Sequence, residues 1–339
     1  MAPVNELQLS VIYDPEEEGQ GVAEVDLVLV HGFGGDFMGT WTSAEGNVFW
    51  PRDLLLQKQP RTRILSFGYD AGETTTATIR DNARTMLVYL ECQRDDESRP
   101  IVFLGQCLGG LIIRQAMCFA KRERTYRSIA SATKSIMFFG TPHGGGDRKG
   151  WLKLAKSYEG FGPKCKMIEV LGNNTTDLCE LDEDFCRLIN NYTIVNFIEM
   201  QPMPGTEKLI VEKADATKTA GLEQVPVNAD HLRMCQFKHA KDSTFLKICK
   251  IIKQAIPKAK EQEAAAAVPP PSSAEWVYAP QPMPQQRMLE SAQHGESYPW
   301  HDYLPQQASS VRFSPGGKPV AASPQYVYVV PVTIKTGKA

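Results

Sequence analysis

Short apolar runs alternate along the chain with longer stretches in which apolar residues recur at helical spacing. Continuous apolar runs of this length are typical of strands buried on both faces of a parallel sheet. The pattern predicts strands at 7–13, 25–30, 63–70, 101–105, 135–139, 193–199 and 209–211. It predicts helices from Trp50, over 74–93, from 108 to about 120, within 148–190 and over 245–256. Because strands and helices alternate, we expect an α/β fold with a mostly parallel, doubly wound sheet and helices on both faces.

The apolar run at 101–105 leads directly into Gly-Gln-Cys-Leu-Gly at 105–109, and an apolar helical pattern follows. A Gly-x-nucleophile-x-Gly sequence between a strand and a helix is the nucleophile elbow of α/β-hydrolases, where the glycines permit a sharp turn. The elbow normally carries serine, whereas this chain carries Cys107. The sequence therefore predicts an α/β-hydrolase fold with Cys107 as the candidate nucleophile.

A second glycine-rich segment, His-Gly-Phe-Gly-Gly at 31–35, follows the predicted strand at 25–30. In lipases and esterases such a segment places a backbone N–H against the substrate carbonyl oxygen. A glycine-rich turn that binds nothing is the alternative, and the presence of the elbow favours the oxyanion interpretation. We expect the backbone N–H groups of Phe33 and Leu108 to form the oxyanion hole.

Acyl transfer also needs a base and an acid that orients it, and α/β-hydrolases carry them in the chain order nucleophile, acid, histidine. Glu199 ends the predicted strand at 193–199, and His231 lies in a loop after the last predicted strand. Both would sit at the carboxyl edge of the sheet, where open α/β sheets keep their sites. Asp215 is the alternative acid, and Asp230 is interpreted as a hydrogen-bonding residue of the loop.

Four further residues are assigned to the surroundings of the substrate: His31, Gly32, Gln106 and His143. For His143, which lies in Thr-Pro-His-Gly-Gly at 141–145, the main interpretation is structural, as a residue that shapes the loop beside the pocket. The glycines at 140–146 lack the Lys-Ser/Thr of a phosphate-binding loop, so no nucleotide site is predicted.

Four segments together resemble the serine-active-site-containing branch of lipase-like α/β-hydrolases. They are Val-His-Gly-Phe-Gly-Gly at 30–35, Gly-Gln-Cys-Leu-Gly-Gly at 105–110, Phe-Phe-Gly-Thr-Pro-His-Gly-Gly at 138–145 and Asn-Ala-Asp-His-Leu-Arg-Met-Cys at 228–235. The resemblance extends over roughly 20–256. It implies hydrolysis of a small ester or lipid substrate, or of a thioester, without a cofactor or metal.

The chain departs from that branch at the elbow, where Gln106 and Cys107 replace His-Ser. One interpretation is that Cys107 works as a nucleophile, because a thiol at a helix N-terminus beside histidine readily forms a thiolate. The sequence would then encode a carboxylic-ester hydrolase with a Cys107–His231–Glu199 triad. The other interpretation is a catalytically silent hydrolase fold that serves as a binding or signalling module, with Cys107 as a small packing residue. The sequence leaves both open.

Composition adds few constraints. Of 339 residues, 42% are hydrophobic and 22% charged, and the net charge of −2 gives no reason to expect a nucleic-acid partner. The eight cysteines show no zinc-ligand spacing, and those in apolar stretches indicate reduced thiols. No signal-peptide core or membrane-spanning run is visible, so we expect an intracellular, cytoplasmic protein. The alternative is peripheral association with mitochondrial or endoplasmic reticulum membranes.

The composition changes at residue 257. Residues 257–339 contain 13 of the 23 prolines, together with an alanine run at 264–267 and glutamine-rich patches. Such a segment buries too little apolar surface to offset its chain entropy. We therefore expect a hydrolase domain at 1–256, with a helical, cap-like insert at about 148–190, followed by a disordered tail that could offer a site to a protein partner.

Overall fold

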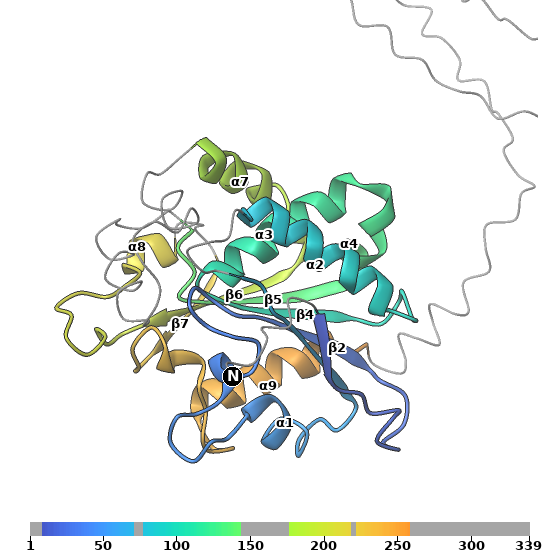
Figure 1. Cartoon of the computed structure of the whole chain (residues 1–339), viewed down its shortest axis with the longest axis horizontal. Helices are drawn as coiled ribbons and strands as arrows, with labels where there is room; N and C mark the ends of the chain where they lie inside the picture. The colour runs from blue at the N-terminus through green and yellow to red at the C-terminus, as the bar shows by residue number, and fades with distance from the viewer. Residues whose placement is uncertain (1–8, 71–76, 144–175, 218–221, 258–339) are drawn as a thin grey trace, which may run out of the picture. The chain divides into compact units, whose positions relative to one another are not determined.

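The computed structural model describes residues 9–70, 77–143, 176–217 and 222–257, which form a central sheet with helices on both faces (Figure 1). The strands are β1 (Leu9–Tyr13), β2 (Val25–Val30), β3 (Thr62–Phe67), β4 (Ile101–Gln106), β5 (Thr133–Phe139), β6 (Thr193–Glu199) and β7 (Glu223–Val227). Their order across the sheet is β1-β3-β2-β4-β5-β6-β7. β1 runs antiparallel to β3, and all other neighbours are parallel. The predicted α/β class with a mostly parallel sheet is confirmed.

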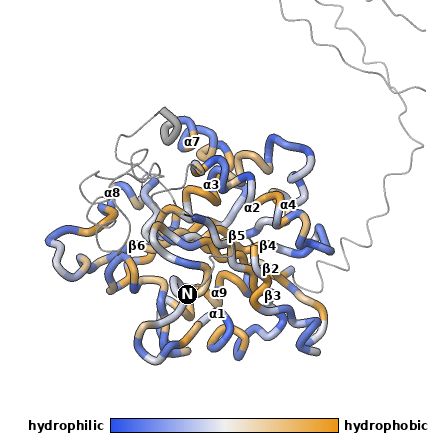
Figure 2. The backbone as a smooth tube through the Cα atoms, in the orientation of Figure 1, coloured by the Kyte–Doolittle hydropathy of each residue, from blue (hydrophilic) through white to orange (hydrophobic). Residues whose placement is uncertain are grey.

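The central strands are apolar because both faces of the sheet are covered. Every residue of β2 and of β4 is buried. Successive side chains point to opposite faces: Val28 and Val30 pack with the helices on one side, and Leu27 and Leu29 pack with those on the other. Figure 2 shows the same layering, with hydrophobic residues concentrated along the strands.

Two groups of helices cover the sheet. The α-helices are α1 (Trp50–Asp53), α2 (Ile79–Gln93), α3 (Leu108–Arg122), α4 (Arg127–Ala132), α7 (Thr176–Cys186), α8 (Lys213–Ala216) and α9 (Ser243–Ala255), and 3-10 turns are η1 (Gly39–Trp41), η2 (Arg124–Tyr126), η3 (Ile189–Asn191) and η4 (Arg233–Cys235). In Figure 1, α2, α3, α4 and α7 lie above the sheet, and α1 and α9 lie below it. α3 starts directly after the elbow, so its position sets that of the candidate nucleophile.

Local sequence signals account for where the helices begin. α2 starts at Ile79 because Thr78 accepts a hydrogen bond from the backbone N–H of Asp81, and the Asp81 carboxylate accepts one from the backbone N–H of Thr78. At α9 the carboxylate of Asp242 accepts from the backbone N–H groups of Thr244 and Phe245.

One predicted strand is wrong. Residues 209–211 form a bend, and the last strand is β7, which begins at Glu223. β7 lies at the edge of the sheet and is largely exposed, so it lacks the apolar run that marks the inner strands. Its Pro226 is tolerated because an edge strand leaves one row of N–H groups unpaired. The apolar residues at 209–211 instead pack beside the end of β6.

Part of the predicted domain layout lies outside the described residues. The insert expected at 148–190 is described only from 176, where α7 begins, and the expected tail is described only at Pro257. Within the described part of the chain, no helix is both long enough and apolar enough to span a membrane.

Candidate active site

Cys107 occupies a strained turn between β4 and α3. Its φ and ψ angles are 55° and −120°, and its backbone N–H donates to the carbonyl of Phe139 at the end of β5. A positive φ is rare for a residue with a side chain, and such strain clusters at functional sites. A strained strand-to-helix turn at this residue is what the elbow motif predicts.

The glycines of the elbow are required by close backbone packing. A Cβ on Gly105 would lie 2.8 Å from backbone atoms of Gly110, and one on Gly109 would lie 2.2 Å from the carbonyl oxygen of Val30. A Cβ on Gly32 would lie 2.6 Å from the Cβ of Cys107. Real Cβ atoms do not approach this closely, so α3 can lie directly over the ends of the strands only without these side chains.

His231 and Glu199 meet at the carboxyl edge of the sheet. The Nδ1 of His231 lies 3.0 Å from Oε2 of Glu199, and both side chains are almost fully buried. The other carboxylate oxygen, Oε1, accepts a hydrogen bond of 2.5 Å from the backbone N–H of Val211. Glu199 is therefore held at both oxygens, and the wrongly predicted strand supplies one of the two donors.

The charges around His231 favour its protonated form. Burial alone would lower the pKa of His231, but the Glu199 carboxylate and the Cys107 thiol outweigh burial and raise this pKa to about 10. The Cys107 thiol therefore lies close to the ring. Glu199 and Cys107 both hydrogen-bond the ring, and Glu199 occupies Nδ1, so Nε2 is the nitrogen that faces Cys107. This nitrogen is therefore placed to exchange a proton with the sulfur.

His31 organises the expected oxyanion segment rather than offering a free ring. Its Nδ1 lies 2.8 Å from the carbonyl oxygen of Gly32, and its Nε2 accepts from the backbone N–H of Tyr69 at 3.2 Å. The ring stacks on that of Tyr69, whose hydroxyl donates to the His31 carbonyl. These partners require a neutral ring with the proton on Nδ1. Burial agrees, since it lowers the pKa of His31 to about 4.

The two expected oxyanion donors come from the turn after β2 and from the elbow itself. Phe33 is buried in the turn after β2, and Leu108 is the first residue of α3. A first-turn N–H has no carbonyl four residues earlier to bond, so it is suited to an anionic oxygen.

Gln106, which replaces the histidine of the resembled branch, links the elbow to the base. Its Nε2 donates to the backbone carbonyl of His231 at 3.2 Å. It also lines a cavity of about 270 Å³ together with residues of the 34–40 segment and with Leu232. Cys107 and His231 lie below the surface, with 1% and 0% of their areas exposed, so a substrate cannot reach the sulfur in this conformation.

His143 belongs to a buried polar chain beside the elbow helix. Its Nδ1 accepts from Arg114 of α3 at 3.2 Å, and its Nε2 lies 3.1 Å from Oδ1 of Asn196 on β6. Arg114 also bonds Asp182 of α7 at 2.7 Å and lies over the ring of Phe185. Both ring nitrogens are thus occupied by protein groups, which favours the structural interpretation of His143 over substrate contact.

Sequence reasoning did not identify Arg114 or Asp182. A charged residue inside the otherwise apolar pattern of α3 was the available signal, because an arginine is rarely fully buried without a partner. The chain of contacts ties together α3, α7, the segment after β5 and the middle of β6.

The remaining acidic candidates lie elsewhere. Asp215 is in the first turn of α8, whereas the carboxylate that contacts the imidazole is that of Glu199. Asp230 accepts from the backbone N–H groups of Leu232 and Arg233, as expected of a loop residue.

The described part of the chain contains no cluster of three or more His, Cys, Asp or Glu side chains that could hold a metal. Six of the cysteines in this part are free thiols: Cys92, Cys107, Cys118, Cys186, Cys235 and Cys249.

Comparison with known proteins places the chain near a group of larger proteins. No protein-family model matches it. It is similar to protein SERAC1 of Homo sapiens, with 22% identity over 276 residues that cover 73% of this chain and 41% of that protein. It is also similar to protein SERAC1 of Danio rerio, with 25% identity over 252 residues that cover 66% of this chain and 37% of that protein. The chain thus spans about two fifths of the length of the curated relatives that it matches.

Solved structures share the architecture at low sequence identity. Phospholipase PlaB from Legionella pneumophila aligns with a TM-score of 0.50 and 15% identity, covering 72% of this chain and 65% of that one. The lipase BlEst2 from Bacillus licheniformis aligns with a TM-score of 0.46 and 13% identity, covering 72% of this chain and 95% of that one. At this level of sequence identity, structural similarity shows the fold alone. The chain has the α/β-hydrolase fold predicted from its elbow.

Proposed function

We propose that the protein hydrolyses carboxylic esters or thioesters, including those of lipids, through a Cys107–His231–Glu199 triad. The observation that carries the proposal is the buried His231–Glu199 pair, 3.0 Å apart, placed beside a cysteine whose φ is 55°. A silent packing residue does not need a strained backbone, whereas a nucleophile gains exposure to the substrate carbonyl from it. The lipases and esterases that share the fold are consistent with this reaction class.

In the proposed reaction, His231 takes the proton of the Cys107 thiol and the sulfur attacks the acyl carbon. As the S–C bond forms, the carbonyl electron pair moves to oxygen, where the N–H groups of Phe33 and Leu108 stabilise the charge. The C–O bond of an ester, or the C–S bond of a thioester, then breaks, and the leaving group takes the proton from His231. Water attacks the acyl-cysteine and gives a proton to His231, which returns it to the sulfur as the carboxylic acid leaves.

Glu199 positions and stabilises the imidazolium throughout. Its Oε2 fixes Nδ1 of His231 as the donor, so Nε2 faces the reacting atoms. Because the pKa of His231 is raised to about 10, the imidazolium form is favoured at neutral pH. A positively charged ring beside the sulfur suits a cysteine nucleophile better than a serine.

The second candidate function is a catalytically silent binding module. The observation that favours it is the burial of the sulfur and of the imidazole, with 1% and 0% of Cys107 and His231 exposed. An active enzyme with this geometry must open before its substrate can bind.

A panel of short-chain and long-chain acyl esters and thioesters, combined with three variants, separates the two functions. We expect turnover by the full chain, its loss in Cys107→Ala, and a burst of acyl-enzyme detectable by mass spectrometry as an adduct on Cys107. Cys118→Ala is the matched control, because Cys118 is a buried thiol of α3, the helix that follows the elbow, with no part in the reaction. Turnover that survives Cys107→Ala refutes the mechanism. Turnover that appears only in Cys107→Ser supports a silenced enzyme.

A further inference from the structure

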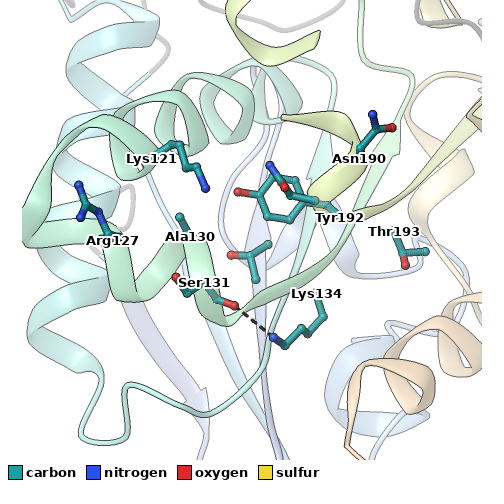
Figure 3. A pocket seen from close by; sticks show the side chains of 10 residues that line it. Lys121, Arg127, Ala130, Ser131, Lys134, Asn190, Tyr192 and Thr193 are labelled. Atoms are coloured by element: carbon teal, nitrogen blue, oxygen red, sulfur yellow. Dashed lines mark hydrogen bonds between the residues drawn. The ribbon is translucent and has the colours of Figure 1, made fainter. Parts of the chain in front are cut away.

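A polar cavity of about 450 Å³ lies at the edge of the sheet opposite the candidate active site. Its walls come from the end of α3, from α4, from the first residues of β5 and from 190–193, where β6 begins (Figure 3). Cys107 follows the carboxyl end of β4, whereas the cavity adjoins the amino ends of β5 and β6. At a rise of about 3.3 Å per residue, a seven-residue strand separates the two places by roughly 20 Å. The cavity is therefore independent of the proposed triad.

The lining itself carries positive charge and no negative charge. Lys121, Arg127 and Lys134 contribute three cations, and no carboxylate lines the cavity. None of these three forms an ion pair with another described residue. Nearby basic residues behave differently, since Arg84 pairs with Glu123 and Arg122 pairs with Asp184. The three cations of the lining are thus not held in ion pairs with described residues, and a bound anion could balance their charge.

Neutral donors complete the lining. The amides of Asn190 and Asn191 border the cavity, and the ring of Tyr192 lies at its centre in Figure 3. Burial raises the pKa of Tyr192 to about 12, so its hydroxyl stays a hydrogen-bond donor at neutral pH. Lys134 is already oriented, because its Nζ donates to the backbone carbonyl of Ser131 at 3.1 Å. Amide and phenol donors among three cations match the several acceptor oxygens of a phosphate group.

A row of solvated lysines on a convex surface would not enclose such a volume. The cavity falls within the range of about 300–1,000 Å³ that is typical of small-molecule sites. It also exceeds the space needed by a single inorganic ion, so the expected ligand carries additional atoms beyond one phosphate.

We propose that this cavity binds a phosphate-bearing molecule, with Lys121, Arg127 and Lys134 neutralising the phosphate and Asn190, Asn191 and Tyr192 donating hydrogen bonds to it. The phosphate belongs either to a soluble phosphorylated compound or to the headgroup of an anionic lipid, since both present the same oxygens. The site is separate from ester hydrolysis and does not depend on the proposed triad.

The test uses the full chain, the Arg127→Gln and Lys134→Gln variants, and Arg124→Gln as the matched control. Arg124 is an exposed arginine of the neighbouring η2 turn that does not line the cavity. Calorimetric titration with inorganic pyrophosphate at low ionic strength tests the soluble source. Flotation with phosphatidylcholine vesicles, with and without phosphatidic acid, tests the lipid source.

We expect saturable binding in one of the two assays and about a tenfold or greater loss of affinity in Arg127→Gln and in Lys134→Gln, because each removes a hydrogen bond to a charged group. Arg124→Gln should bind as the unmodified chain does. All of these positions are exposed, and unchanged melting temperatures should show that the variants fold. Absence of binding in both assays, or an equal loss in the Arg124→Gln control, overturns the proposal.

Discussion

Replacing Glu199 with glutamine tests the physical basis of the proposed site most directly. The side chain keeps its length and volume but loses its charge and one acceptor oxygen. In the native site, Oε2 contacts Nδ1 of His231 at 3.0 Å and Oε1 accepts from the backbone N–H of Val211 at 2.5 Å. An amide has one oxygen for these two donors, so one buried N–H is left facing an NH2 group.

The substitution should change both the pKa of His231 and the stability of the fold. The carboxylate is the leading cause that raises the pKa of His231, so Glu199→Gln should move this pKa down from about 10. In the double variant with Cys107→Ala only burial remains, and the pKa should fall below 6.5. The unsatisfied buried donor should destabilise the fold by about 1–3 kcal/mol. The cost stays below that of an orphaned buried charge because His231 can release its proton.

The pKa can be measured by NMR titration of the His231 ring, and the stability by urea unfolding at neutral pH. If the triad works, ester turnover should also fall by about 10²–10⁴-fold, since the imidazole loses its orientation and its tautomer. Glu199→Asp is the matched control. It retains the charge but withdraws the carboxylate by about 1.5 Å, the length of one C–C bond. It should therefore keep the His231 pKa above 6.5 while lowering turnover.

The reasoning fails if His231 titrates at the same pH in the native protein and in Glu199→Gln. It also fails if the double variant still titrates above 6.5, since burial would then not be the opposing term. Unchanged turnover together with the expected pKa shift would refute only the catalytic role of Glu199.

Two further substitutions test the packing and the charge state of the segments around the elbow. Gly109→Ala should destabilise the protein by about 1–3 kcal/mol in urea unfolding, because the new Cβ would lie 2.2 Å from the Val30 carbonyl and α3 must move; an unchanged midpoint would show that α3 does not pack as described. The pKa of His31 is lowered from 6.5 to about 4 in the folded protein. As the pH falls, His31 is therefore protonated in the unfolded chain before it is protonated in the folded one, and the free energy of unfolding should decrease between pH 6.5 and about 4. The difference in unfolding free energy between the native chain and His31→Gln should therefore shrink by about 1.4 kcal/mol per pH unit, and a constant difference across the interval would contradict the assignment.

The sequence by itself determined the strands that are buried on both faces. β2, β4, β5 and β6 lie where apolar runs predicted them, because a strand covered on both sides is apolar at most of its positions. The elbow at 105–109 was equally visible, since a turn that packs α3 over strand ends leaves room only for glycine. The buried strands and the elbow can be predicted from the sequence because each depends on residues that are adjacent in the chain.

The edge of the sheet was not encoded in this way. β7 is exposed and contains Pro226, so its pattern resembles a loop, whereas the apolar residues at 209–211 resembled a strand. Position in the sheet decides between the two, because an outermost strand needs partners on one side only.

Only the tertiary structure decided which side chains meet. The order of Glu199 and His231 along the chain was compatible with a triad, but the contact at 3.0 Å depends on where the ends of β6 and the loop after β7 come together. The same holds for the ring proton of His31, which is set by Gly32 and Tyr69, and for the burial of Arg114 against Asp182. The cavity lined by Lys121, Arg127 and Lys134 is built from segments that are distant in sequence from the second wall at 190–193. Hydrogen bonds and charge balance act over a few ångströms in space, and sequence separation carries little information about such distances.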